Sequence, residues 1–252
     1  MKLQFASDLH IEFPENKEFL LKNPLKPVGD ILILGGDIVP FRQMDEYSDF
    51  FDLMGEKFRL TYWLPGNHEY YRSDLTERPL TLNEKVRDNI ILVNNSSVAD
   101  GKIRMIFSTL WSKISPALQY ELMLAYSDFR IIRNNKLLLT IDQYNSMHQE
   151  CLSFLTDELG KKFDGITIVI THHMPTFFNY PEEYTESPLR EAFATELSDL
   201  IVETAPEYWI FGHYHNNNGD FNLGKTMLVT NQLGYVLYNE QSRFDPGKYI
   251  EI

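Results

Sequence analysis

The chain has 252 residues, an apolar fraction of 43% and a formal net charge of −13, with 36 acidic against 23 basic side chains. This length and composition predict a folded protein of one domain, residues 1–252, and exclude a disordered chain. The acidic excess argues against extended contact with nucleic-acid backbones or anionic lipids, because both require a basic surface. The one cysteine, Cys151, excludes an internal disulfide framework.

Short apolar runs alternate with helical patterns through the first part of the chain. Such runs are too short to cross a bilayer and are typical of strands buried in a sheet that is covered on both faces. In chain order, the predicted elements are a strand at 3–7, a strand at 31–34, a helix at 44–58, a strand at 60–64, a short helix at 80–87, and strands at 90–93 and 103–107. This alternation predicts an α/β fold.

The pattern becomes helical over residues 111–159, where helices at 117–125 and 143–155 are expected. This segment is predicted to be a helical insertion, either packed near the functional site as a cap or covering one face of a sheet. Further strands are predicted at 166–170 and 208–211. The tail, including residues 226–230 and 249–252, is typical of β-hairpins, with glycines as turn residues.

Polar motifs rich in carboxylate, amide and imidazole groups follow several of the predicted strands. They are Asp8-x-His10, Gly36-Asp37, Gly66-Asn67-His68-Glu69, His172-His173 and Gly212-His213-Tyr214-His215. Each motif alone is a weak signal, because a polar residue at a strand end is commonly part of a turn. All of them in this order are specific, and together they supply the ligands that divalent metals prefer. The pattern predicts metal-assisted hydrolysis of a phosphate ester.

A pair of metal ions about 3.5–4 Å apart requires a shared ligand, for which a carboxylate is suited because it has two oxygens and a charge. Asp37 is the best candidate, since it follows a buried strand and two glycines. Asp8 and His10 are expected on the same face of an extended segment, within reach of one metal. His213 and His215 share that spacing and can serve neighbouring metals.

The Gly-Asn-His-Glu motif supplies two further groups. Asn67 contributes a neutral oxygen, and its neighbour His68 then points elsewhere and is free for proton transfer. His172 and His173 are also neighbours on an extended segment, so only one of the two is expected to face the metals. His148 lies in a helical stretch beside polar residues, and we expect it to be a solvated surface residue.

Over residues 3–215, the order of these motifs resembles the calcineurin-like metallophosphoesterase superfamily. The resemblance implies a four-layer α/β/β/α sandwich, with two mixed β-sheets packed together and helices outside. It implies that Mn, Fe or Zn ions occupy two sites. The implied ligands are Asp8, His10, Asp37 and His215 for one metal, and Asp37, Asn67, His172 and His213 for the other. It also favours His172 over His173 as the ligand, and implies that His68 acts as general acid or stabilises the transition state.

The sequence departs from the Ser/Thr protein phosphatases of this superfamily, which carry Gly-Asp-x-x-Asp-Arg-Gly. Pro40 and Phe41 stand where that branch has a carboxylate partner for the catalytic histidine and a phosphate-binding arginine. The overall pattern, which ends with Gly-His-x-His at 212–215, is more similar to the bacterial phosphodiesterases and general phosphohydrolases of the superfamily.

We therefore expect a phosphoesterase that hydrolyses a phosphate mono- or diester through a hydroxide activated by two metals. A protein phosphatase, a nuclease and a non-catalytic metal-binding scaffold are the alternatives. The expected partner is a small phosphorylated substrate, without extended nucleic acid or membrane, and the residues that bind the rest of it are not predicted. We expect a cytoplasmic location, because cleavage of an N-terminal signal would remove part of the site.

Overall fold

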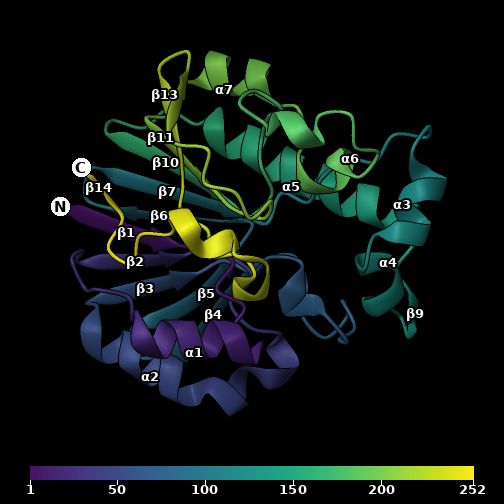
Figure 1. Cartoon of the computed structure of the whole chain (residues 1–252). Helices are drawn as coiled ribbons and strands as arrows, with labels where there is room; N and C mark the ends of the chain where they lie inside the picture. Colours follow the sequence, from purple (N-terminus) through teal and green to yellow (C-terminus); the bar gives the residue numbers. More distant parts are fainter.

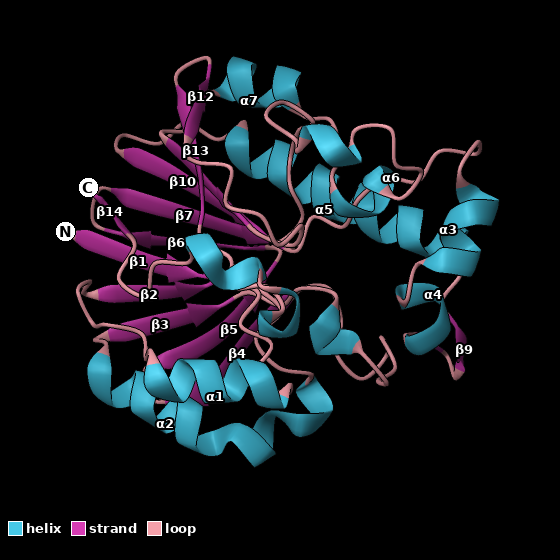
Figure 2. Cartoon of the chain, viewed as in Figure 1, coloured by secondary structure: helices cyan, strands magenta, loops and turns pink.

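In the computed structural model, two six-stranded mixed sheets lie face to face, with helices on their outer faces (Figure 1; Figure 2). The structure describes residues 1–252, apart from the side chain of Glu183. This arrangement confirms the predicted four-layer α/β/β/α sandwich. Among the described residues, no helix has the length and apolarity needed to span a bilayer.

The first sheet has four parallel strands between two antiparallel edge strands. In spatial order the strands are β14 (Tyr249–Glu251), β1 (Lys2–Ala6), β2 (Ile31–Leu34), β3 (Leu60–Trp63), β5 (Ile90–Asn94) and β4 (Leu82–Arg87). Helices α1 (Pro14–Lys22) and α2 (Ser48–Lys57) cover its outer face. Leu32 and Leu34 point to that face, where they join a core cluster with Phe51 of α2.

The second sheet also has parallel central strands and antiparallel edges. In spatial order its strands are β12 (Phe221–Leu223), β13 (Thr226–Thr230), β11 (Tyr208–Phe211), β10 (Ile166–Thr171), β7 (Ile103–Ser108) and β6 (Ser96–Asp100). Helices α5 (Ile141–Leu159) and α7 (Ser198–Thr204) cover its outer face. Val169 and Trp209 face this layer and form a core cluster with Ile201.

Between the two sheets lies a third apolar cluster to which both contribute. Phe5 and Ile33 come from the first sheet, and Phe107 and Ile168 come from the second, and all four are buried. Because successive side chains of a strand alternate between faces, strands buried on both sides must be apolar throughout. The continuous apolar runs in the sequence reflect this double burial.

The predicted helical insertion is present. Its elements are α3 (Gln119–Ala125), α4 (Asp128–Ile131), the short strands β8 (Arg133–Asn134) and β9 (Leu137–Leu138), and α5. Helix α5 begins at a capping box, in which the Thr140 hydroxyl accepts from the Gln143 N–H and the Gln143 side chain accepts from the Thr140 N–H. It covers the second sheet, whereas α3 and α4 extend beyond the sheet edge (Figure 1).

Three predicted elements were wrong in type, extent or pairing. Residues 80–87 form no helix, because Leu82–Arg87 is a strand that pairs antiparallel with β5. A helix here would leave the backbone N–H and C=O groups along that side of β5 unpaired. The helix predicted at 44–58 is a 3₁₀ segment, Phe41–Tyr47, followed by α2. The β12–β13 hairpin forms, but β14 pairs with β1 at the far end of the chain. Short helices complete the chain: α6 (Arg190–Phe193) and 3₁₀ turns at His68–Tyr70, Glu182–Tyr184, Val236–Tyr238 and Glu240–Arg243.

Candidate metal centre

The polar motifs of the sequence all lie where parallel strands end. β1, β2 and β3 of the first sheet and β10 and β11 of the second run toward the same edge of the sandwich. The carboxyl ends of parallel strands share one edge, so residues distant in sequence meet there. The structure brings together at this edge the residues Asp8, His10, Asp37, Asn67, His68, His172, His213 and His215.

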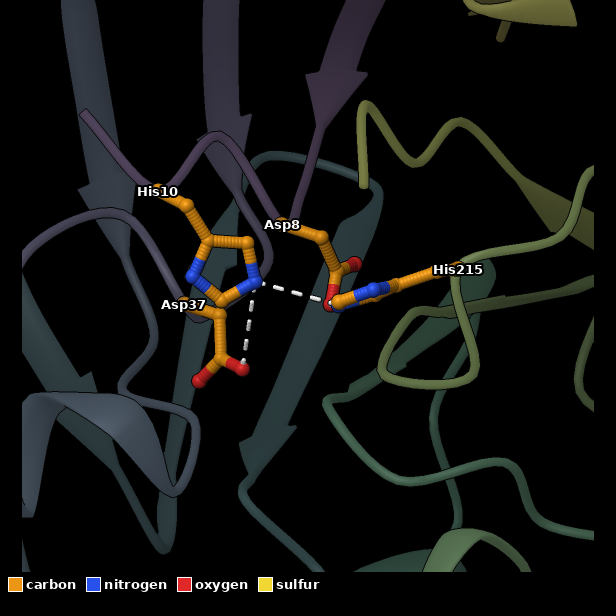
Figure 3. A group of neighbouring side chains, drawn as sticks. All are labelled: Asp8, His10, Asp37 and His215. Carbon is orange, nitrogen blue, oxygen red and sulfur yellow. Dashed lines mark hydrogen bonds and ion pairs between the residues drawn. The ribbon is translucent and has the colours of Figure 1, made fainter. Parts of the chain in front are cut away.

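One group of potential ligand atoms comprises Asp8, His10, Asp37 and His215, and these atoms all lie within 4.8 Å of one another (Figure 3). The Nε2 atoms of His10 and His215 are 3.0 Å apart. His10 Nε2 lies 3.8 Å from Asp37 Oδ2, and His215 Nε2 lies 3.4 Å from Asp8 Oδ1. Two imidazoles and two carboxylates that converge on one point suit a transition metal.

A second group, on the other side of Asp37, comprises Asp37, His172 and His213. His172 Nε2 lies 3.4 Å from Asp37 Oδ1 and 3.1 Å from His213 Nδ1. The two oxygens of Asp37 therefore face different groups, Oδ2 toward His10 and Oδ1 toward His172. Gly66 allows this approach, since a Cβ there would overlap Asp37 Oδ1 and the His172 ring.

Asn67 presents a buried oxygen that has no hydrogen-bond partner among the described residues. Its Nδ2 donates to Asp128 Oδ1 at 2.9 Å and to the Tyr126 hydroxyl at 3.3 Å, which fixes the orientation of the amide. Its Oδ1 is buried and unpaired. A buried amide oxygen without a hydrogen-bond partner destabilises the fold. This atom is therefore suited to bind a metal ion together with the second group. The donor set and this unpaired oxygen fit a pair of metal ions.

The backbone at these motifs is bent in a way that the sequence reasoning missed. β1 ends at Ala6, and both Asp8 and His10 have positive φ, of 55° and 45°. They are not alternate positions of a strand, so the period-two argument for their convergence was wrong. Asp37, His213 and His215 also adopt positive φ. Left-handed conformations of this kind cost free energy and are found at functional sites that the surrounding structure stabilises.

Glu69 links two of the metal-site loops through its carboxylate. It accepts hydrogen bonds from the backbone N–H groups of Gly66 at 2.7 Å, Asp37 at 2.9 Å and Ile38 at 2.8 Å, and from Trp63 Nε1 at 3.1 Å. Burial and the charge of Asp37 raise the pKa of Glu69 to about 7. The four donors hold the loops after β2 and β3 together, which positions Asp37 beside Asn67.

The charges of the carboxylates and imidazoles are balanced against each other. Burial is the largest single influence on the pKa of His172 and lowers it, but the charges of Asp37 and Asp8 and the hydrogen bonds of the ring together raise this pKa to about 9. Burial also lowers the pKa of His215, but the hydrogen bonds and charges of Asp8 and Glu240 together raise it to about 10. Without bound metal, protonated imidazoles thus offset the buried carboxylates. Metal binding would displace these protons, because imidazole binds metal through an unprotonated nitrogen.

Glu240 forms a hydrogen bond with the ring nitrogen of His215 that faces away from the other ligand atoms. Its Oε2 lies 2.8 Å from His215 Nδ1 and accepts from the Tyr235 N–H at 2.6 Å. A carboxylate in this position fixes the ring orientation of a metal-binding histidine and raises its basicity.

Glu240→Gln is expected to weaken metal binding by about 10- to 100-fold, because the carboxylate behind a ligating histidine contributes roughly that much. The measurement is a competition titration against a chromophoric chelator. Glu251→Gln, on exposed β14, is the matched control and is expected to bind metal normally. Equal affinity in both variants would refute the supporting role of Glu240.

His68 lies beside both groups without belonging to the predicted ligand set. Its Nε2 is 4.0 Å from Asp37 Oδ2 and 3.3 Å from the Tyr235 hydroxyl, and its ring stacks on Tyr71. Glu12 Oε1 lies 3.7 Å from His68 Nδ1 and 3.5 Å from His10 Nδ1. Glu12 thus offers His68 the carboxylate that the sequence motif around Asp37 lacks.

Two other histidines are structural. His173 is fully buried, with Nδ1 3.1 Å from the Thr109 carbonyl oxygen and Nε2 3.4 Å from the Tyr144 hydroxyl, and it belongs to neither group of ligand atoms. The expectation that His148 is a solvated surface residue was wrong. It is 2% exposed, and its Nδ1 lies 2.8 Å from the Trp111 carbonyl oxygen, because it sits on the face of α5 that packs against the core.

Sequence reasoning assigned no role to several side chains that complete the site. Glu12 and Glu69 had a positional signal, since each lies within two residues of a predicted site histidine. Asp128 and Glu240 had none, because their contacts depend on how the insertion and the tail fold back.

The comparisons with known proteins agree with this geometry. A family model described as calcineurin-like phosphoesterase matches residues 1–217. The match covers most of the chain, so the protein belongs to the calcineurin-like phosphoesterase family, and the predicted resemblance is confirmed.

Individual relatives are more distant. An uncharacterized protein, L509, of Acanthamoeba polyphaga mimivirus is 30% identical over 276 residues, which cover 99% of this chain and 96% of that protein. The phosphopantetheinyl hydrolase PptH from Mycobacterium tuberculosis is 17% identical, with a TM-score of 0.71 over 99% of this chain and 95% of that structure. A dimetal phosphatase from Danio rerio is 11% identical, with a TM-score of 0.52 over 92% of this chain and 87% of that structure. At these identities the two structures share the fold alone.

Proposed function

We propose that this protein hydrolyses a phosphate mono- or diester with the help of two metal ions. The observation that carries the proposal is the position of Asp37, whose two oxygens face two separate groups of buried ligand atoms. In this proposal, the ligands are Asp8, His10, Asp37 and His215 for one ion, and Asp37, Asn67, His172 and His213 for the other. Mn, Fe and Zn are the proposed metals, because the mixed oxygen and nitrogen donors suit them.

The side chains around the site have distinct tasks in this reaction. When bound, the metal ions would supply charge neutralisation at the phosphoryl group and activation of a water molecule. Asp37 holds the geometry, and the hydrogen bonds to Glu69 keep its loop in place. His68 donates a proton to the leaving oxygen, with Glu12 beside its Nδ1 and Tyr71 stacked on its ring.

The alternatives have less support. A protein phosphatase of the familiar type lacks its arginine here, since Phe41 is buried against Trp63 and Tyr70. A nuclease needs a basic groove, which a net charge of −13 disfavours. A scaffold that no longer needed metal would be expected to lose ligands, and every predicted ligand position is filled. A small phosphorylated substrate and a cytoplasmic location remain predictions.

Removal of metal tests the proposal directly. Protein treated with a chelator is expected to lose hydrolysis of para-nitrophenyl phosphate and of bis-para-nitrophenyl phosphate, and to regain it with Mn, Fe or Zn. The measurements are release of nitrophenol and the metal content of protein purified without added ions. An empty site together with no hydrolysis under any metal would favour the scaffold. Cleavage of single-stranded DNA with Mn, at rates above those for small esters, would favour the nuclease.

A further inference from the structure

Two cavities meet at the candidate metal centre. An inner cavity of about 440 Å³ contains Asp37, Asn67 and His68 in its wall, and an outer cleft of about 810 Å³ opens beside it. Both are lined by His215 and Glu240, so they join at the edge of the first group of ligands. A phosphoryl group bound at the centre thus has a separate space on each of two sides.

The wall of the inner cavity is aromatic and apolar. Apart from the metal-site residues and Glu240, most of its lining side chains are aromatic or aliphatic, and these are Tyr71, Ala125, Tyr126, Tyr180, Tyr184, Leu189, Phe193, Tyr214 and Tyr235. Among the described residues, no lysine or arginine lines this cavity. A flat or apolar substituent would bury surface here, and ring stacking would add to its binding.

The outer cleft has a different composition, rich in amide side chains. Its lining includes the asparagines Asn179, Asn216, Asn217, Asn218 and Asn239, together with the charged side chains of Glu182, Glu240 and Arg243. Asn217 is committed to the fold, because its side chain bonds both the N–H and the C=O of Gln232. The side-chain amides of Asn216 and Asn239 make no hydrogen bond to another described residue. Each offers a donor and an acceptor to an uncharged polar group.

We propose that the substrate is a phosphodiester with two unlike arms: an aromatic or apolar arm in the inner cavity, and an uncharged hydrogen-bonding arm in the outer cleft. This inference rests on the proposed function and deepens it. His68 lines the inner cavity only, so the inner arm is the one that leaves.

The reaction balances as a simple hydrolysis. The oxygen of water forms a bond to phosphorus, and the bond from phosphorus to the inner arm's oxygen breaks. That oxygen takes a proton from His68 and leaves as an alcohol. The attacking water keeps one proton as the P–OH group of the product and releases the other to solvent, from which His68 regains its proton. The outer arm stays on phosphorus, so the second product is a phosphate monoester.

The charges near the site argue against a monoester as the substrate. A monoester carries a second negative charge, and no basic side chain in the described wall of the inner cavity meets it. The buried or half-buried carboxylates of Glu12, Asp128 and Glu240 surround the centre instead. Like charges repel, which penalises the dianion more than the monoanionic diester.

A matched series of para-nitrophenyl esters tests the inference on Mn-loaded protein. The leaving group is constant, and the series consists of the monoester, the methyl diester and the N-acetylaminoethyl diester, which carries an amide. We expect kcat/KM for the methyl diester to exceed that for the monoester by about tenfold or more. We expect kcat/KM for the amide-bearing diester to exceed that for the methyl diester by about 3- to 10-fold, which is the gain that one or two hydrogen bonds give.

In Asn216→Leu, the ratio of kcat/KM for the amide-bearing diester to that for the methyl diester is expected to fall to about 1. Asn222→Leu, an exposed asparagine on β12 outside both cavities, is the matched control and is expected to preserve it. Calorimetric binding of the corresponding non-hydrolysable phosphonates provides a readout besides activity, and the same ratio of affinities is expected to fall. The far-ultraviolet circular dichroism spectrum and the melting temperature of Asn216→Leu verify that the variant is folded.

The outcomes separate this inference from the proposed function. Preference for the monoester over both diesters overturns the two-arm substrate but leaves the phosphoesterase intact. An unchanged ratio in Asn216→Leu overturns the role of the outer cleft. Absence of hydrolysis for all three probes with every metal refutes the proposed function itself.

Discussion

Asp37→Asn is expected to lower metal-dependent hydrolysis by about a thousandfold or more, since a metal clamp contributes several kcal/mol to the transition state. Asn has one weakly basic oxygen in place of a charged pair, so it cannot hold two cations at once. It can still accept the hydrogen bond that the His68 N–H donates to Asp37 Oδ1 at 2.9 Å, so the fold is expected to persist. The measurements are kcat with Mn and the number of metal ions bound per chain.

Asp30→Asn is the control for this variant, because Asp30 is an exposed aspartate directly before β2. It is expected to retain both activity and metal content. Removal of the Asp37 charge leaves protonated His172 without its buried partner, so the thermal stability of the metal-free Asp37→Asn protein is expected to be lower. Two bound metals and an unchanged kcat in Asp37→Asn would exclude the shared-carboxylate arrangement.

His68→Gln is expected to reduce kcat by roughly 10²- to 10⁴-fold for an ester with a poor leaving group, as loss of a general acid does. The loss is expected to be much smaller for para-nitrophenyl esters, because nitrophenolate leaves without a proton. Metal content is expected to stay at that of the unsubstituted protein, since His68 is outside the proposed ligand set. The comparison of kcat for an alkyl and a nitrophenyl diester checks both points.

An equal loss for both leaving groups would assign His68 to stabilisation of the transition state in place of proton donation. Loss of bound metal would show that His68 acts as a ligand. Full activity on both esters would remove His68 from the mechanism.

Which residues gather at the site was predictable from the sequence. Asp37, Asn67, His172 and the other motif residues each follow a short apolar run, and buried parallel strands require such runs. Parallel strands end at one edge, so the polar residues after them meet there without further information. The same reasoning yields an α/β fold, because strands that are apolar on both faces need a covering layer on each side, whereas the four-layer sandwich was implied by the family resemblance.

Local geometry was less predictable. The convergence of Asp8 and His10 arises from positive φ at both residues and not from strand alternation. Such conformations are intrinsically unfavourable and persist only when surrounding hydrogen bonds hold them, as those from the Asp8 N–H to Gly36 and the His10 N–H to Asp37 do here. Residues 80–87 likewise became β4 through pairing with β5, which overrides local preference.

The sequence by itself determined which carboxylates, amides and imidazoles stand at the ends of the strands. This pattern was sufficient to indicate the calcineurin-like phosphoesterase family. Only the tertiary structure decided what surrounds them. Asp128 reaches Asn67 from the insertion, and Glu240 reaches His215 from the tail. The outer cleft joins loops from distant parts of the chain. Contacts of this kind carry no periodic signal, because they depend on how irregular segments fold back over the edge of the sheets.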